Sequence, residues 1–462
     1  MNRKLASWAA ALALAACHGS SNNQPVPPLP ADCTLPAPVA SALDGGQVLE
    51  LGTHQTGDSI TFTVPPGTAS VSILQQAVGN VPLRVVFDNK GPQVVDNSVV
   101  PRFVYFPDGG VAYDDAKTPS AGADKTVDPS GTFVEFSADT PVAAAFTFPN
   151  TAASLAAGVT PGNWRFIVGD FAHECATEFA CLDGGTDQDK YDIKVVLKPQ
   201  AATANLDVNF YIVGSATTRT GAAFTAAVAK NDASVQRMIQ TFTGLYGAQG
   251  ITLRNVAFFD VSAADRAKYS NIVISGDTTG DGPCDQLAQM FLLSSANPGL
   301  SVNLFLVDDL VDTSPSGSVS LVGIDGTIPG TATLAGTVHS GAAVSMADLF
   351  VNSAVECAAA QAPNLNTCGA DVVAYISAHE TGHFLGLFHT TEAGGQAHDL
   401  IADTPECPLT SDRGGKGFLN NGDCADFDGH NFLFWLDDGL ADASITTQQS
   451  AVLLRSPIVE NR

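Results

Sequence analysis

Eleven consecutive residues decide how the rest of this chain is interpreted: His379-Glu380-Thr381-Gly382-His383-Phe384-Leu385-Gly386-Leu387-Phe388-His389. The stretch has the form H-E-x-x-H-x-x-G-x-x-H, and an apolar segment precedes it. The spacing predicts a helix over residues 370–387, on which His379 and His383 project from one face because they are four residues apart. Gly386 accepts the positive φ that ends a helix sharply, so the reversed chain brings His389 toward the other two histidines.

Three neutral imidazoles are ligands that zinc accepts at about 2.0–2.1 Å, and three protein ligands leave a fourth position open for chemistry. Glu380 directly follows the first histidine and can point at the open position, where it would take the proton of a bound water. The alternative is an ordinary buried helix, but the composition of this chain gives the full pattern a chance expectation of roughly 6 in a million. Zn²⁺ on His379, His383 and His389, with Glu380 as catalytic base, is therefore predicted.

These residues resemble the metzincins, and among them the pappalysin-type endopeptidases, whose motif typically reads HExGHxLGLxHT. Three further stretches agree with that family: Asp403-Thr404-Pro405, the segment 429–435, which is similar to its Asn-x-Met turn, and the segment 445–449, which is similar to the start of its C-terminal helix. The resemblance extends over about 205–458 and is specific over 379–406 and, less so, 429–449. It implies an α/β (α+β) zinc peptidase domain that hydrolyses peptide bonds in protein or peptide substrates.

Two positions depart from the family pattern. Leu433 stands where the family has the Met beneath the zinc, and a swap that conserves volume is expected to cost little. Trp435 stands where the family has a tyrosine; its indole N–H can donate a hydrogen bond to an oxyanion or substrate but cannot ligate a metal. Asp437 and Asp438 follow, where relatives build the S1′ pocket wall. They predict a preference for a basic residue there, with an exposed acidic loop as the alternative.

These departures motivate a second hypothesis from another class of protein. The chain would then be a cell-surface binding or adhesion lipoprotein that keeps the metzincin fold with weak or no activity. The intact Glu380 argues against this hypothesis, since zinc binding alone does not require that carboxylate.

The first residues have the features of an export signal. Arg3 and Lys4 precede a short apolar run, which ends in Leu14-Ala15-Ala16-Cys17. This ending resembles the lipobox of bacterial lipoproteins, which implies a signal peptide over 1–16 and a lipid anchor on Cys17; a plain secretory signal is the alternative. His18, rather than Asp, favours the outer membrane or cell surface by similarity to Gram-negative lipoproteins. No stretch reaches the ~18 apolar residues of a transmembrane helix.

Export changes how the remaining eight cysteines are interpreted, because an oxidising compartment favours disulfides over metal thiolates. Connectivity cannot be deduced from sequence alone. Short spacing makes three local pairs plausible: Cys175–Cys181, Cys357–Cys368 and Cys407–Cys424. A pair between Cys33 and Cys284 would be left by elimination.

Composition and patterning predict several domains. Residues 17–44 have too little apolar content to fold and are expected to form a flexible tether. Residues 45–200 contain short alternating segments separated by turn signals, which is typical of a β-sandwich. Beyond a boundary near 199–202 the pattern becomes α/β. Strands are predicted over 206–213, 251–259 and 302–307, the last of which is very apolar, and helices over 222–246 and 370–387. Residues 201–462 therefore form the predicted catalytic domain.

The net charge of the chain restricts the kinds of partner that it can bind. The net charge of −26 excludes a basic nucleic-acid surface. Aspartate outnumbers glutamate, and exposed aspartates suit Ca²⁺, the second candidate cation. Asp277–Gly282 and the cluster of Asp423, Asp426 and Asp428 are the candidate calcium loops, each with a solvated turn as the alternative. His398 is more consistent with a loop histidine than with a ligand, because His389 already completes the set.

Overall fold

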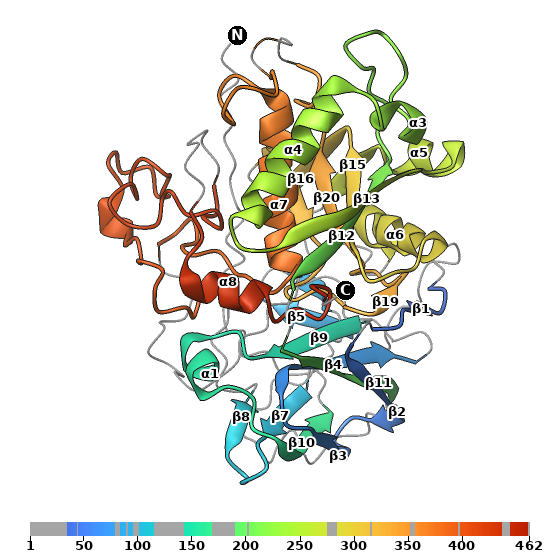
Figure 1. The fold of residues 1–462 in the computed structure, drawn as a ribbon, viewed down its shortest axis with the longest axis vertical. Coiled ribbons are helices and arrows are strands. Elements are labelled where there is room, and N and C mark those ends of the chain that lie inside the picture. The colour runs from blue at the N-terminus through green and yellow to red at the C-terminus, as the bar shows by residue number, and fades with distance from the viewer. Residues whose placement is uncertain are drawn as a thin grey trace.

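The computed structural model describes a mixed α/β protein with several separate sheets (Figure 1). The residues that it describes are 35–43, 45–78, 84–88, 91–95, 101–114, 143–168, 190–200, 203–274, 284–314, 317–351, 355, 357–395, 398–436 and 444–460. No helix within these ranges combines the length and the apolar character needed to cross a membrane.

Residues 45–200 contain two four-stranded antiparallel sheets, which we call the sheet pair. Their orders are β3-β10-β7-β8 and β2-β11-β4-β9. The strands of the sheet pair are β2 (Gln47–Gln55), β3 (Ser59–Val64), β4 (Thr68–Ala77), β7 (Pro101–Tyr105), β8 (Val111–Asp114), β9 (Ala143–Phe148), β10 (Gly162–Val168) and β11 (Lys190–Pro199). In β3 the residues alternate between exposed and buried, as the sequence predicts. Side chains from both sheets share one apolar core.

Smaller elements accompany these sheets. A short helix, α1 (Ala152–Ala157), follows β9, and β5 (Arg84–Asp88) pairs with β6 (Gly91–Val95). Thr151 caps α1 by accepting a hydrogen bond from the backbone N–H of Ser154.

Residues 203–460, which we call the C-terminal region, are organised around a five-stranded sheet of order β13-β12-β15-β20-β18. These strands are β12 (Asn205–Ile212), β13 (Thr252–Asp260), β15 (Val302–Val307), β18 (Gly323–Asp325) and β20 (Ala342–Ser345). The first four strands in this order run parallel, and β18 runs antiparallel at the edge. β15 is central and fully buried, which explains why its sequence is continuously apolar.

A second, three-stranded sheet joins β14 (Asn271–Ile274), β16 (Asp309–Ser314) and β17 (Gly317–Leu321). The helices of the C-terminal region are α3 (Ala226–Ala229), α4 (Ala233–Gly247), α5 (Ala263–Tyr269), α6 (Gln286–Phe291), α7 (Gly369–Phe384) and α8 (Thr447–Leu453). Short 3₁₀ turns lie at Leu292–Ala296 and Leu409–Ser411.

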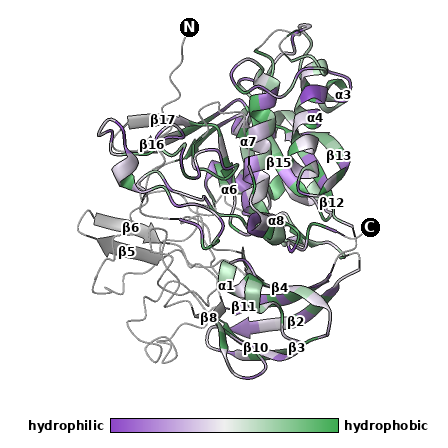
Figure 2. Cartoon of the chain, turned by 60° about the vertical axis from the view of Figure 1, so that its left-hand side comes forward, coloured by the Kyte–Doolittle hydropathy of each residue, from purple (hydrophilic) through white to green (hydrophobic). Residues whose placement is uncertain are grey.

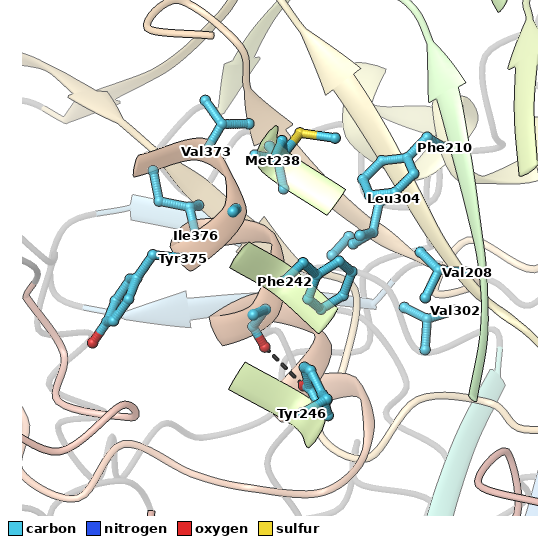
Figure 3. Close-up of a cluster of buried hydrophobic side chains, with 14 of the residues drawn as sticks. Val208, Phe210, Met238, Phe242, Tyr246, Val302, Leu304, Val373, Tyr375 and Ile376 are labelled. Atoms are coloured by element: carbon cyan, nitrogen blue, oxygen red, sulfur yellow. Dashed lines mark hydrogen bonds between the residues drawn. The ribbon is translucent and has the colours of Figure 1, made fainter. Parts of the chain in front are cut away.

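Helices α4 and α7 pack against each other and against the five-stranded sheet. Figure 3 shows Met238 of α4 next to Val373 of α7, and Phe242 of α4 near strand residues such as Leu304. The Tyr246 hydroxyl donates a hydrogen bond of 2.9 Å to the Ala378 carbonyl, one residue before the H-E-x-x-H motif. The apolar half of α7 is thus core, and this packing fixes the helix that carries the motif.

The two regions are in direct contact. β1 (Val39–Ala40) pairs with β19 (Leu334–Ala335), and the backbone N–H of Ala152 donates to the Leu400 carbonyl. Helix α1 lies beside α8 in both views (Figures 1 and 2). Residues 39–41 were expected to belong to a flexible tether, but they are hydrogen-bonded to residues 333–335, so that expectation is wrong for them.

Most predicted elements of the C-terminal region are present, with two corrections. The helical pattern over 222–246 is interrupted, because Asp232 caps a new helix by accepting hydrogen bonds from Ser234 and Val235. The motif helix ends at Phe384 rather than at residue 387.

Two of the predicted disulfides are confirmed: Cys357–Cys368 and Cys407–Cys424. Cys284 is also disulfide-bonded. Cys17, Cys33, Cys175 and Cys181 lie outside the described residues, so the predictions made for them stay predictions.

Candidate metal centre

Helix α7 is held at its first turn by a buried ion pair. Asp371 accepts two hydrogen bonds from the Arg237 guanidinium of α4, at 2.7 and 2.9 Å, and one of 2.5 Å from the Thr241 hydroxyl. A buried carboxylate is tolerated only when it is paired in this way. The contact sets the position of α7 on α4, and thereby the direction in which the motif side chains project.

The end of α7 redirects the chain toward the centre. Gly386 has a φ of +112°, a conformation that side-chain-bearing residues rarely adopt. Its N–H donates to the His383 carbonyl and the next residue, Leu387, donates to the Gly382 carbonyl. The predicted role of Gly386 as the residue that ends the helix and turns the chain is confirmed.

The three motif histidines come together, as predicted. The Nε2 atoms of His379 and His383 are 3.0 Å apart, and those of His379 and His389 are 3.3 Å apart. One ligand atom from each histidine lies within 4.8 Å of the others. Each Nδ1 faces an oxygen: the Phe432 carbonyl for His379 at 2.8 Å, the Leu387 carbonyl for His383 at 2.7 Å and the Glu392 carboxylate for His389 at 2.8 Å.

These contacts assign the tautomers. A carbonyl oxygen only accepts, so the Nδ1 atoms of His379 and His383 must carry the protons, and their Nε2 atoms present lone pairs. Burial, together with the charges of the neighbouring histidines, lowers the pKa of His379 to about 3 and that of His383 well below its usual range. Both rings are therefore neutral at physiological pH, which is the form that binds metals.

This arrangement fits a zinc ion. Lone pairs facing one another at 3.0–3.3 Å repel unless a cation lies between them. Ligand nitrogens at the usual zinc distance of 2.0–2.1 Å in a tetrahedron are separated by about 3.3 Å. The histidines thus bring three nitrogens together with separations that suit zinc for two of the pairs, and His379 and His383 have the protonation state that zinc requires.

Sequence reasoning missed Glu392, which lies three residues after the last histidine. Its carboxylate accepts the Nδ1–H of His389, so the imidazole is oriented with Nε2 toward the other two. Burial alone would raise the pKa of Glu392, but the charge and the hydrogen bond of His389 lower this pKa below its usual value. A carboxylate behind a ligating histidine also raises the basicity of the ligand. The only feature of the sequence that could have pointed to Glu392 is that it is a polar residue close to the motif.

Glu380 lies against the edge strand β18. A Cβ atom added to Gly323 would lie 2.3 Å from Glu380 Oε1, so only glycine leaves room for the carboxylate. Glu380 is 6% exposed, and burial and the neighbouring Asp325 carboxylate raise its pKa well above the usual range. Burial also raises the pKa of Asp325 to about 7, and its Oδ2 has no hydrogen-bond partner among the described residues. Asp325 is the second residue that sequence reasoning missed.

The turn after the second disulfide supports the centre from below. Leu433 is fully buried and its side chain lies 3.3 Å from the position a Cβ would take on Gly382, while its carbonyl accepts from the N–H of Thr390. Leu433 is thus buried against α7, and its place beneath a zinc ion stays a prediction. The Trp435 N–H donates to the Leu419 carbonyl at 3.1 Å, within a separate apolar cluster. This N–H is committed to the protein, so the predicted oxyanion or substrate contact of Trp435 lacks a free donor.

The candidate calcium residues do not form one site. Asp423 accepts from Lys416 Nζ at 2.7 Å and from two backbone N–H groups, and Asp426 is an exposed residue near Arg413. Asp428 is buried, and burial raises the pKa of its carboxyl. The three carboxylates therefore have separate environments.

Other predicted residues are placed as follows. His398 Nδ1 lies 3.1 Å from the Thr391 hydroxyl and is not one of the three histidines that could share a metal ion, as expected of a loop histidine. Asp437, Asp438 and the loop Asp277–Gly282 lie outside the described residues.

Comparison with known proteins adds no assignment. No family model matches the chain, and no curated protein matches it significantly.

Proposed function

We propose that this protein is a zinc-dependent metalloendopeptidase of the metzincin kind, with a β-sandwich domain before a metzincin-like catalytic domain. The observation that carries the proposal is the convergence of three histidine Nε2 atoms, each oriented through its Nδ1, beside a buried glutamate. The resemblance of residues 379–390 to the pappalysin-type motif supports the same conclusion.

In this proposal His379, His383 and His389 hold the zinc ion. When bound, zinc supplies a Lewis acid that polarises a carbonyl group and lowers the pKa of water. Glu380 acts as the general base, because a carboxylate with a raised pKa takes and returns protons readily. It accepts a proton as the water oxygen attacks the scissile carbonyl carbon, and it delivers the proton to the amine nitrogen as the C–N bond breaks. Glu392 and the Phe432 carbonyl keep the histidines oriented throughout.

A peptide substrate suits the edge strand beside this glutamate. Strand β18 is the last strand of its sheet and pairs with β20 alone among the described residues. An extended peptide can add to such an edge through main-chain hydrogen bonds. Since Gly323 of β18 contacts the Glu380 carboxylate, a peptide on that edge would pass next to the catalytic base.

The same proposal places the enzyme at the bacterial cell envelope, held by a lipid on Cys17. The lipobox-like ending of the signal peptide supports this localisation, and the two disulfides fit an oxidising compartment. Cys17→Ser should release the protein from the membrane fraction. A variant that stays in that fraction after a salt wash would contradict the anchor.

The decisive experiment compares proteolysis of a denatured protein mixture by the form lacking residues 1–17 with that by its Glu380→Gln variant. Glu50→Gln, an exposed carboxylate on β2, is the matched control. We expect cleavage by the parent and the control, none by Glu380→Gln, and one zinc per chain in all three. Absence of zinc from the parent would refute the proposal, and zinc without cleavage would favour the binding lipoprotein.

A further inference from the structure

The end of helix α8 is completed by side chains of the sheet pair. Lys198 of β11 donates from Nζ to the carbonyls of Leu454 and Ser456, at 2.5 and 2.8 Å. Ser70 of β4 donates from its hydroxyl to the carbonyl between them, that of Arg455, at 2.6 Å. The last carbonyls of a helix have no partner within it, and a buried carbonyl without a partner costs stability. The sheet pair thus donates to the carbonyl of the C-cap residue, Leu454, and to those of the next two residues, of which Ser456 also accepts from the backbone N–H of Val459.

The start of the same helix holds the turn below the metal centre. Gln449 and Asn431 exchange two side-chain hydrogen bonds, at 2.9 and 3.1 Å, and both residues are buried. Asn431 Oδ1 also accepts from the backbone N–H of Leu433 at 2.9 Å. Because the oxygen receives both bonds, the conformation of residues 431–433 depends on where α8 places Gln449.

The turn at residues 431–433 orients one of the three motif histidines. The carbonyl of Phe432 accepts the Nδ1–H of His379 at 2.8 Å. Val452 of α8 also lies 3.5 Å from the position a Cβ would take on Gly386, the residue that redirects the chain toward His389. A short helix therefore contacts the supports of two of the three histidines on one side and the sheet pair on the other (Figure 1).

We propose that the sheet pair is a positioning module for the metal centre, with Lys198 and Ser70 holding α8 in the place from which Gln449 and Asn431 orient His379. The metal in this proposal rests on the proposed function, whereas the coupling through α8 does not. The sheet pair is then a permanent part of the active enzyme. It is neither an inhibitory segment removed for activity nor a spacer without influence on the centre.

The test uses the chain lacking residues 1–17 and the variant Lys198→Met, which keeps the length of the side chain and removes its donors. Lys194→Met is the matched control: Lys194 lies on the same strand but pairs with Glu50 inside the sheet pair. Hydrogen exchange is measured over residues 429–436 and 444–456, and zinc affinity is measured by competition with a chelator.

In Lys198→Met we expect about tenfold faster exchange in both segments, with the rest of the C-terminal region unchanged. We expect zinc affinity to fall roughly three- to tenfold, less than for direct loss of a residue that contacts a ligand. The control should match the parent in both measurements. Unchanged exchange over 429–436 and unchanged zinc affinity would overturn the proposal, and so would increased zinc affinity.

A milder variant covers the case in which Lys198→Met does not fold. Ser70→Ala removes one donor and should show the same pattern at about half the logarithmic effect. If the parent binds no zinc, the proposed function fails, but the exchange of residues 429–436 still decides whether the sheet pair controls this turn.

Discussion

The core of the sheet pair and helix α7 are both deeply buried, but they bury different kinds of side chain. Trp164 lies at the centre of the sheet pair, in edge-to-face contact with Phe106 and Phe148 at ring-centroid distances of 5.1 and 5.3 Å. Its N–H donates to the Thr160 carbonyl, so the ring adds apolar area without leaving a polar atom unpaired. This core contributes to stability through the burial of apolar side chains.

Helix α7 buries Glu380, His383 and Asp371 along with its apolar residues. Burying such groups costs free energy unless each has a partner. Asp371 has its partners within the protein, whereas the histidine Nε2 atoms face one another and Glu380 faces another carboxylate, Asp325. The comparison teaches that α7, unlike the core of the sheet pair, buries ionisable groups that face one another, and that the packed residues around the helix hold these groups in place.

The largest effect should follow from removing the central aromatic ring of the sheet pair. Trp164→Ala is expected to lower the free energy of unfolding by about 3–5 kcal/mol, because a large buried side chain leaves a cavity. The zinc affinity of the folded protein should change less than about threefold, since Trp164 touches none of the residues that support the centre. Denaturant unfolding and chelator competition measure the two quantities. Phe427→Ala, at an exposed position, is the control, and similar losses in both variants would contradict the comparison.

Glu392→Gln should have the opposite effect: it should lower the zinc affinity and leave the stability of the metal-free protein nearly unchanged. The amide still accepts the Nδ1–H of His389, but it lacks the negative charge that increases the basicity of the ring. We expect zinc affinity to fall about 10- to 100-fold, with little change in the stability of the metal-free protein. Chelator competition and thermal unfolding in EDTA separate these outcomes. Equal zinc affinity in Glu392→Gln and the parent would show that the carboxylate does not support the centre.

The contact between the two regions should respond to pH. Burial, with a smaller contribution from the charge of Arg455, lowers the pKa of Lys198 to about 7. The unfolded chain, with a lysine pKa near 10.5, holds the proton in the interval between these values, so raising the pH favours the folded state. From pH 7 to 9 we expect this residue to add on the order of 1–2 kcal/mol of stability. Lys198→Met should lack this rise, and an equal pH dependence in both proteins would contradict the assignment.

The smallest effect is expected at the floor of the centre. Leu433→Met conserves volume, so the free energy of unfolding should change by less than about 1.5 kcal/mol. Zinc affinity and peptidase activity should stay within about twofold of the parent. The Leu433 side chain packs against Gly382 and has no polar atom that could hydrogen-bond to a histidine. A tenfold gain in activity would show that leucine at this position limits the reaction.

Local sequence signals predicted the elements that local physics controls. Residues 302–307 form the buried strand that their apolar run indicates, and the i, i+4 spacing places His379 and His383 on one face of α7. The positive φ at Gly386 and two of the disulfide pairs were also predicted, because each depends on residues that are close together in the sequence. The break at Asp232 was missed because a capping aspartate competes with helix propensity only once its side chain accepts the next N–H groups.

The sequence by itself determined the donor set: which three histidines, which glutamate, and the turn that brings the last histidine back. Only the tertiary structure decided what orients them, because the Phe432 carbonyl, Asp325 and the Asn431–Gln449 pair come from segments more than 40 residues away from the motif. The contact of Lys198 with α8 spans 256 residues of sequence. Such partners have no periodicity or spacing that links them in the chain, and their roles arise only when packing brings buried polar groups within hydrogen-bonding distance.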